Sequence, residues 1–371
     1  MQNPTIMVQI KEVIQSLEKL APPVYQESYD NSGLLTGDYN ALVQGVLISL
    51  DCTEKVVEEA VRKKCNMIVA HHPIIFSGLK KLTGSNYIER TIISAIKNDI
   101  AIYAIHTNLD NVIDGVNKIL ADKIGLIHTS ILLPKKNTQK KLVTYIPAEN
   151  VDDVLSELHK AGAGIIGDYS HCSFKTSGTG SYIPSSKANP HIGTTRKKEI
   201  VDEVKVELVF PIDKEQEVIQ SLKATHPYEE VAYFINSTDN TNRAIGSGMI
   251  GELDEPMDAM TFLQDLKRKL NLKIIRHTAI TKKNIKKIAI CGGSGNFLLK
   301  VAKKANADLF ISGDFKYHEF FDAENEIIIA DIGHYESEVY TKELINEYLL
   351  KNFSNFAVHL GETVTNPISY L

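Results

Sequence analysis

The chain has 371 residues, of which 43% are hydrophobic and 23% are charged, and these values are ordinary for a globular protein. A chain of this length predicts two or three domains, with enough apolar residues for sizeable cores. The formal net charge of −5 argues against nucleic acid as a partner, since domains that bind it are usually strongly basic. The longest apolar runs have only the length of strands, so we expect no membrane-spanning segment.

The four cysteines are scattered along the chain and form no C-x-x-C pair. This spacing disfavours a disulfide scaffold or a cysteine-ligated zinc site, and isolated thiols suit a reducing cytosol. Residues 1–20 are amphipathic and lack the uninterrupted apolar core of a signal peptide. We therefore expect a cytoplasmic protein.

The first third of the chain predicts alternating helices and strands. A helix over 5–20 leads into a turn-rich stretch that ends in Asp30-Asn31-Ser32-Gly33. The elements predicted after it are strand 45–50, helix 53–64 with Thr53 as its N-cap, strand 66–70, helix 85–98, strand 100–105 and helix 114–124. The strand over 66–70 runs into His71-His72-Pro73, and the strand over 100–105 runs into the segment from His106 to Asp110.

The middle of the chain differs in composition. From about 128 to 240 it is richer in turn residues, Lys, Ser and Thr. The patterns predict strands over 142–146 and 203–210, helices over 151–161 and 214–225, and turns in the Gly- and Ser-rich stretches 162–181 and 185–195. This order predicts a small α+β, ferredoxin-like insert domain over 128–240.

The last third repeats the strand–helix–strand theme of the first. Its predicted elements are strand 287–290, a turn at Gly292-Gly293-Ser294-Gly295, helix 296–304, strands 308–312 and 327–331, and one long helix over 335–351. We interpret residues 1–127 and 241–371 as two related α/β halves with mostly parallel sheets. Ligands of such sheets collect beyond the carboxyl ends of the strands.

Five potential metal ligands lie at such positions. His71 and His72 end one strand, and Asp110 lies just past another. His334 and Glu338 are spaced i, i+4 at the start of the long helix, so they share one face. A set of imidazoles and carboxylates suits zinc, manganese or iron, and a bridging carboxylate such as Glu338 could join two ions. A histidine at a strand end is more often a plain rim residue, so spacing alone leaves a structure without metal open.

Two more histidines are candidates for proton transfer. His106 lies four residues before Asp110, and His318 follows Gly313-Asp314 on a predicted loop or short helix. For both, an ordinary surface role is an equal alternative. The turn at Gly292–Gly295 could offer backbone N–H groups to a phosphate, although a tight turn without a ligand is the favoured reading, since it lacks the lysine of a P-loop.

Several longer motifs are specific in combination. They are Asp30-Asn31-Ser32-Gly33-Leu34, Ala70-His71-His72-Pro73-Ile74-Ile75-Phe76, His106-Thr107-Asn108-Leu109-Asp110-Asn111, Gly313-Asp314 with Tyr317-His318-Glu319, and Gly333-His334-Tyr335-Glu336-Ser337-Glu338. Together they resemble the family of GTP cyclohydrolase 1 type 2 homologues, the NIF-three-like dinuclear-metal proteins. The insert resembles that of the long bacterial members through 167–174 and 226–230. Tyr29 is a mild departure, because a Trp is common there.

The resemblance implies more than the residues show. It places two divalent metal ions per chain, with zinc expected first and manganese or iron as alternatives, on His71, His72, Asp110, His334 and Glu338. It implies a homohexamer built as a trimer of dimers. It also makes the insert similar to PII- and CutA-like domains.

Two functions remain open on these grounds. The first is a metal-dependent hydrolase acting on a nucleotide or a phosphorylated small molecule, with His106 or His318 moving protons. The alternative is a non-catalytic regulator or scaffold that responds to metal or ligand and forms a hexameric ring. Neither reading predicts a membrane or nucleic acid as partner.

Overall fold

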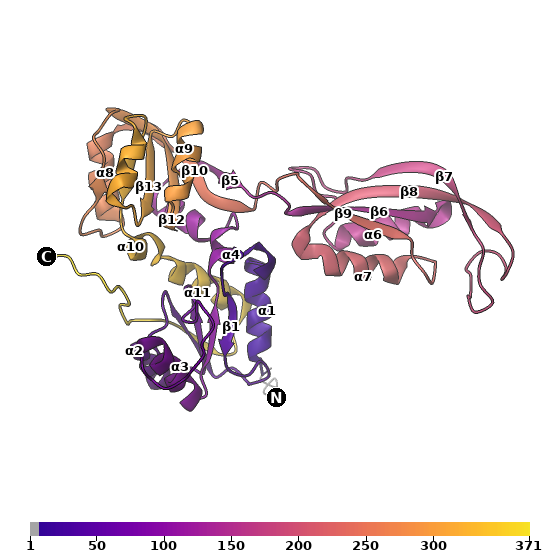
Figure 1. The fold of residues 1–371 in the computed structure, drawn as a ribbon, viewed down its shortest axis with the longest axis horizontal. Coiled ribbons are helices and arrows are strands. Elements are labelled where there is room, and N and C mark those ends of the chain that lie inside the picture. The colour runs from indigo at the N-terminus through magenta and orange to yellow at the C-terminus, as the bar shows by residue number, and fades with distance from the viewer. Residues whose placement is uncertain (1–6) are drawn as a thin grey trace. The chain divides into compact units, whose positions relative to one another are not determined.

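The computed structural model describes residues 7–371, which form two compact units (Figure 1). The main unit consists of the described chain up to Pro134 together with Ala244–Leu371, and the insert is Lys135–Arg243. The first helix, α1, spans Ile10–Leu20, and the predicted positions 5 and 6 lie outside the described residues. No helix within residues 7–371 is both long enough and apolar enough to cross a membrane.

The first sheet of the main unit has five strands in the order β1-β4-β3-β2-β15. Four of them run parallel, and β1 is the antiparallel edge strand. Helices α2 and α3 cover one face with apolar side chains. The bounds are β1 Gly33–Thr36, β2 Gly45–Ser49, α2 Glu54–Arg62, β3 Met67–Ala70, α3 Tyr87–Lys97, β4 Ala101–Ala104 and β15 Ala357–Leu360.

The register of this sheet brings three strand ends to one edge. Ser49 of β2 lies beside Ala70 of β3, and Ala70 lies beside Ala104 of β4. The residues that follow these positions therefore leave the sheet side by side. Beyond β4 the chain forms the short helix α4, Thr107–Asp110, and then α5, Val116–Ile124.

The second sheet has six strands in the order β11-β14-β13-β12-β10-β5, in which β13 pairs in parallel with β12 and β14 and the other pairs are antiparallel. Alternate side chains of β12 face opposite ways, so that Ile288 and Ile290 pack in the core beneath α8 while Ala289 packs beneath α9. Figure 1 shows the sheet between these two helices. The bounds are β5 Ile127–Pro134, β10 Gly246–Asp258, α8 Ala259–Lys269, β11 Arg276–His277, β12 Asn284–Ser294, α9 Leu299–Lys304, β13 Leu309–Gly313 and β14 Ile328–Asp331.

The segment predicted as one helix over 335–351 is two helices, α10 (His334–Glu338) and α11 (Thr341–Asn352). The break has a packing cause. Helix α10 lies against β12 and β13 of the second sheet, whereas α11 lies against β2 and β15 of the first sheet. One straight helix could not pack against both sheets, so the chain changes direction between α10 and α11.

The short 3₁₀ helices are η1 (Pro23–Tyr25), η2 (Ala148–Asn150), η3 (Ile212–Lys214), η4 (Asn296–Leu298) and η5 (Tyr317–Ala323). Of these, η4 precedes α9, so that the predicted helix over 296–304 begins as a tighter turn. The predicted turn at 292–295 is also different, because β12 continues through Ser294.

The insert is an antiparallel sheet in the order β7-β8-β6-β9 with two helices, and its chain order β-α-β-β-α-β is that of a ferredoxin-like fold. Its elements are β6 Gln139–Pro147, α6 Val151–Lys160, β7 Phe174–Tyr182, β8 Glu199–Pro211, α7 Glu215–Thr225 and β9 Tyr233–Thr238. β7 lies in a stretch predicted as turns, because this edge strand is exposed on both faces and shows no apolar alternation. The insert begins at Lys135 rather than 128, since β5 pairs with β10 of the main unit.

Candidate metal centre

Side chains from the ends of both sheets meet in the main unit. His71 and His72 follow β3, His106 follows β4, and Asp110 ends α4. His334 and Glu338 begin and end α10, which follows β14 of the second sheet. Three overlapping groups of potential ligand atoms result, each within 4.8 Å: His71, His72 and His106; His72, His334 and Glu338; and His71, Asp110 and Glu338.

Glu338 joins two of these groups through its two carboxylate oxygens. Its Oε2 lies 2.9 Å from His72 Nε2 and 3.0 Å from His334 Nε2. Its Oε1 lies 3.9 Å from His71 Nε2, and Asp110 Oδ1 lies 3.6 Å from the same nitrogen. One oxygen thus faces each group, which is how a carboxylate bridges two cations.

Each of the four imidazoles is anchored through Nδ1. The Nδ1 of His71 lies 2.8 Å from the carbonyl oxygen of Ile105. Carboxylate oxygens lie 2.7 Å from the other three Nδ1 atoms: Asp51 at His72, Asp30 at His106 and Asp314 at His334. Such acceptors keep the proton on Nδ1, orient the ring and leave Nε2 to bind a metal.

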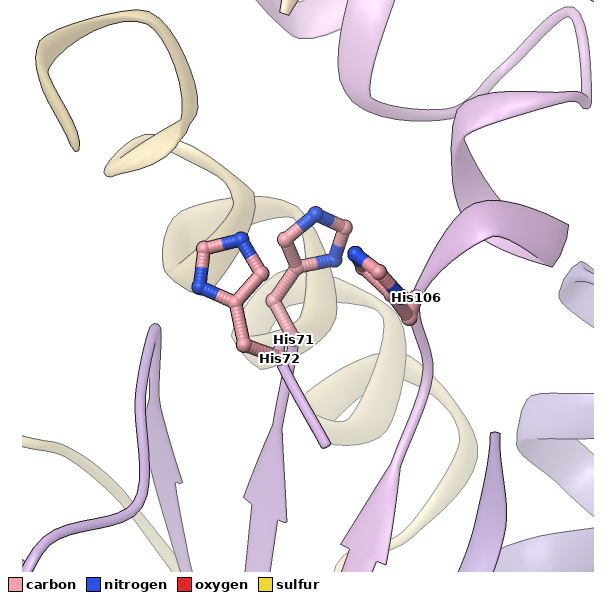
Figure 2. Close-up of side chains that lie close together, drawn as sticks. All are labelled: His71, His72 and His106. Carbon is pink, nitrogen blue, oxygen red and sulfur yellow. The ribbon is translucent and has the colours of Figure 1, made fainter. Parts of the chain in front are cut away.

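His106 completes one side of the cluster (Figure 2). Its ring centroid lies 5.3 Å from that of His71 and 5.3 Å from that of His72. Figure 2 shows the three rings close together just beyond the ends of the strands. The structure thus brings His106 beside His71 and His72.

Of the six buried side-chain nitrogen or oxygen atoms within the described residues that have no hydrogen-bond partner, two belong to the cluster. They are His71 Nε2 and Asp110 Oδ1. Buried polar atoms are nearly always paired, because an unpaired one costs about 1–3 kcal/mol. An imidazole nitrogen and a carboxylate oxygen that face each other without a bond are suited to a cation between them, so these residues fit a divalent metal.

The electrostatics of the cluster point the same way. Burial and the neighbouring charge of Glu338 raise the pKa of Asp110 to about 7. Burial would lower the pKa of His72, but its bonds to Asp51 and Glu338 outweigh burial and raise that pKa to about 10. Burial alone would raise the pKa of Glu338, but its contacts with His334, His71 and His72 hold it well below the usual value. The two buried carboxylates thus need positive charge beside them, which protons or cations can supply.

The glycines of 292–295 serve the cluster in an unexpected way. A Cβ at Gly293 would lie 2.3 Å from Glu338 Oε1, and Gly293 adopts a φ of +62°, which side chains rarely tolerate. Its N–H donates to Ser337 Oγ, and the Gly292 N–H donates to Asn117 Oδ1. These N–H groups are therefore occupied, and the glycines make room for a carboxylate rather than a phosphate.

The second predicted proton-transfer residue lies elsewhere. His318 is on η5, is exposed, and its ring contacts those of Tyr317 and Phe321. None of the three groups found among the described residues includes it.

Sequence reasoning missed the outer carboxylates. Asp51 and Asp314 follow β2 and β13 by the same rule that singled out His71, so the rule could have found both. Asp30 lies in the predicted turn-rich stretch, yet it accepts hydrogen bonds from Thr107 N and Oγ1 and holds His106. The sequence feature that distinguishes Asp30 is a carboxylate within a turn-rich stretch.

Comparison with known proteins agrees with this arrangement. The profile of Duf34/NIF3 (NGG1p interacting factor 3) matches residues 8–367. A Bacillus subtilis relative named GTP cyclohydrolase 1 type 2 homolog is 38% identical, covering 97% of this chain and 98% of its own. A Staphylococcus epidermidis relative of the same name is 36% identical over 98% of this chain and 100% of its own.

Solved structures give the same result. A Bacillus cereus protein related to NIF3 superposes with a TM-score of 0.86 at 36% identity, covering 98% of this chain and 99% of that one. The Staphylococcus aureus protein SA1388 superposes with a TM-score of 0.77 at 33% identity over the same shares. On sequence and fold alike, the chain belongs to the Duf34/NIF3 family.

Proposed function

We propose that the chain binds two divalent metal ions and uses them as a hydrolase of a nucleotide or a phosphorylated small molecule. The observation that carries the proposal is the division of the cluster into two groups that share Glu338, with one carboxylate oxygen turned toward each. His72 and His334 would hold one ion, and His71 and Asp110 the other. The name of the Bacillus subtilis relative supports a nucleotide as the substrate class.

The donor set favours zinc, with manganese or iron as alternatives, because it offers imidazole nitrogens and carboxylate oxygens without a thiolate. The four cysteines are free, and Cys291 is buried with its pKa raised by burial, so it is a poor thiolate donor. Paired cations in such a centre lower the pKa of bound water and polarise the group to be hydrolysed.

The chain itself would handle the proton. His106 presents Nε2 to the cluster while Asp30 holds its Nδ1, so it is oriented to take or give a proton at that atom. We assign this role to His106 rather than His318, because only His106 lies among the candidate ligands. Asp30 would keep the ring in one tautomer throughout.

The test is metal content per chain, measured by plasma mass spectrometry on untagged protein after saturation with zinc and gel filtration. We expect about two equivalents in the parent, a sharp loss in Glu338→Ala and His72→Ala, and no change in the matched control His318→Ala. Turnover of GTP and of a phosphoester should disappear with the metal. Retained metal in Glu338→Ala would disprove the bridging role, and turnover without metal would disprove the hydrolase.

A non-catalytic regulator or scaffold is the second candidate, and the insert supports it. Both faces of its edge strand β7 are exposed, and Phe174 and Ile200 expose 66% and 70% of their surface, as expected of a surface that meets another chain. We propose a PII/CutA-like insert, a homohexamer and a cytoplasmic location in either case. Light scattering tests the assembly, and ligand binding without consumption would favour this candidate over the hydrolase.

A further inference from the structure

Two exposed aromatic rings continue the row of imidazoles away from the metal centre. Phe76 exposes 53% of its surface and Tyr29 exposes 64%. The ring centroid of Phe76 lies 6.4 Å from that of His106 and 6.3 Å from that of Tyr29. The planes of Tyr29 and Phe76 are tilted by 42°, and Phe76 meets His106 edge-on at 74°, so the rings form an angled aromatic wall from the candidate ligands past His106 to solvent.

This wall is built by the motif Asp30-Asn31, which the metal centre alone does not explain. Asn31 Nδ2 donates to the carbonyl oxygen of Ile75, at 2.6 Å, and so fixes the loop that carries Phe76. Asp30 binds His106 and Thr107, and so fixes the other side. Tyr29 is the residue next to this clamp. The motif thus sets the positions of both exposed rings relative to the centre.

Packing in the core does not explain the positions of Tyr29 and Phe76. A large aromatic side chain gains most by burial, and here two are held half exposed and beside each other at the site. The charge of Asp110 is among the causes, after burial and Glu27, that raise the pKa of Tyr29, so the phenol lies in the field of the centre. Exposed aromatic faces of this kind stack flat heteroaromatic rings such as nucleobases.

We propose that Tyr29 and Phe76 form a stacking platform that holds a planar heteroaromatic ring of the substrate beside the metal centre. The inference rests on the proposed function and adds to it the substrate class, a compound with a nucleobase-like ring rather than a sugar phosphate alone. The platform therefore selects substrates that contain such a ring, while the metal centre carries out the hydrolysis.

The experiment compares two probes on zinc-loaded protein by isothermal titration calorimetry: GMP, which has the ring, and ribose 5-phosphate, which lacks it. We expect the parent to bind GMP at least about tenfold more tightly, in line with one stacked base. The double variant Tyr29→Ala with Phe76→Ala should lose this preference and keep its affinity for ribose 5-phosphate and its zinc content. Tyr29→Phe with Phe76→Tyr, which keeps both rings, should retain the preference.

Leu82→Ala is the matched control, since Leu82 is an exposed apolar residue of the same loop segment, with 49% of its surface exposed. Equal binding of the two probes by the parent, or an unchanged preference in the double alanine variant, overturns the platform. A double variant that changes only the oligomeric state in light scattering also overturns it, because the rings would then contact a second copy. Ring-dependent binding without turnover would leave the platform standing and reject the hydrolase, whereas turnover with ring-independent binding would do the reverse.

Discussion

Two histidine motifs of this chain look alike in sequence and differ in structure. The insert carries His226-Pro227-Tyr228-Glu229-Glu230, which superficially resembles a metal-binding pair. In the structure both ring nitrogens of His226 are used: Nε2 lies 2.9 Å from the carbonyl oxygen of Tyr145, and Nδ1 accepts from Tyr228 N at 3.1 Å. Such a histidine has no nitrogen left for a ligand.

In the main unit each imidazole of the cluster is anchored from outside the cluster through Nδ1 alone. Each Nδ1 meets a fixed acceptor, and the Nε2 atoms of His71, His72 and His334 face the carboxylates of Glu338 and Asp110. The number of histidines in a motif therefore does not identify a metal site. A metal site is identified by imidazole rings whose Nδ1 atoms are held by outer acceptors and whose Nε2 atoms face carboxylates.

Within this comparison, the largest effect on zinc affinity should come from removing the acceptor that holds the Nδ1 atom of one ring. In Asp51→Ala, His72 loses the acceptor at Nδ1 and can rotate, so zinc affinity should fall about 10–100-fold, as is typical for outer partners of ligating histidines. Competition with a chromophoric chelator measures it. Asp51→Asn, which keeps an acceptor, should fall in between. An affinity in Asp51→Ala equal to the parent's would show that anchoring does not matter.

Glu59 can be compared with the carboxylates of the cluster, because it is a buried carboxylate whose hydrogen-bond donors are supplied by the protein. Its carboxylate accepts hydrogen bonds from Glu362 N, Thr363 N and Thr363 Oγ1. Glu59→Gln should lower the free energy of unfolding at pH 7 by about 1–3 kcal/mol in zinc-free protein, because charge-assisted bonds are lost. The exposed neighbour supplies the control, Glu58→Gln, which should be neutral.

The effect of Glu59→Gln should depend on pH. Burial raises the pKa of Glu59, but the hydrogen bonds from residues 362 and 363 outweigh burial and lower it to about 2 from 4.5. The folded protein thus holds this carboxylate charged more firmly than the unfolded chain does. The stabilisation is complete above pH 4.5 and is lost as the pH falls toward 2. Denaturant titrations of parent and variant should converge over that range, and a constant difference would contradict this account.

The smallest effect on metal is expected at His226. His226→Ala should leave the zinc content at the parent value, because the bonded ring has no free nitrogen. It should still lower the melting temperature of the insert, since it removes the hydrogen bond between the ring and the carbonyl oxygen of Tyr145, worth about 0.5–1.5 kcal/mol. Calorimetry and metal analysis on one sample test both statements. Loss of zinc here would erase the distinction between the two motifs.

The sequence alone determined the elements and the candidate ligands of the first sheet. Buried runs such as 45–50 and 66–70 form β2 and β3 as predicted, because apolar strands bounded by turn residues depend mainly on local pattern. His71 and His72 stand out because they break such a run at the end where parallel sheets bind ligands. The resemblance to the family, carried by the motifs, is confirmed by the comparisons.

Only the tertiary structure decided how the residues meet. Local pattern holds no record that β15, from the end of the chain, pairs with β2, or that α10 and α11 must part to reach different sheets. It could not show that Glu338 turns one oxygen to each group, or that Asp51, Asp30 and Asp314 hold three of the rings. These contacts join residues far apart in the chain, and 266 positions separate His72 from Glu338. They depend on the packing of two sheets. The periodicity of a few neighbouring residues does not determine that packing.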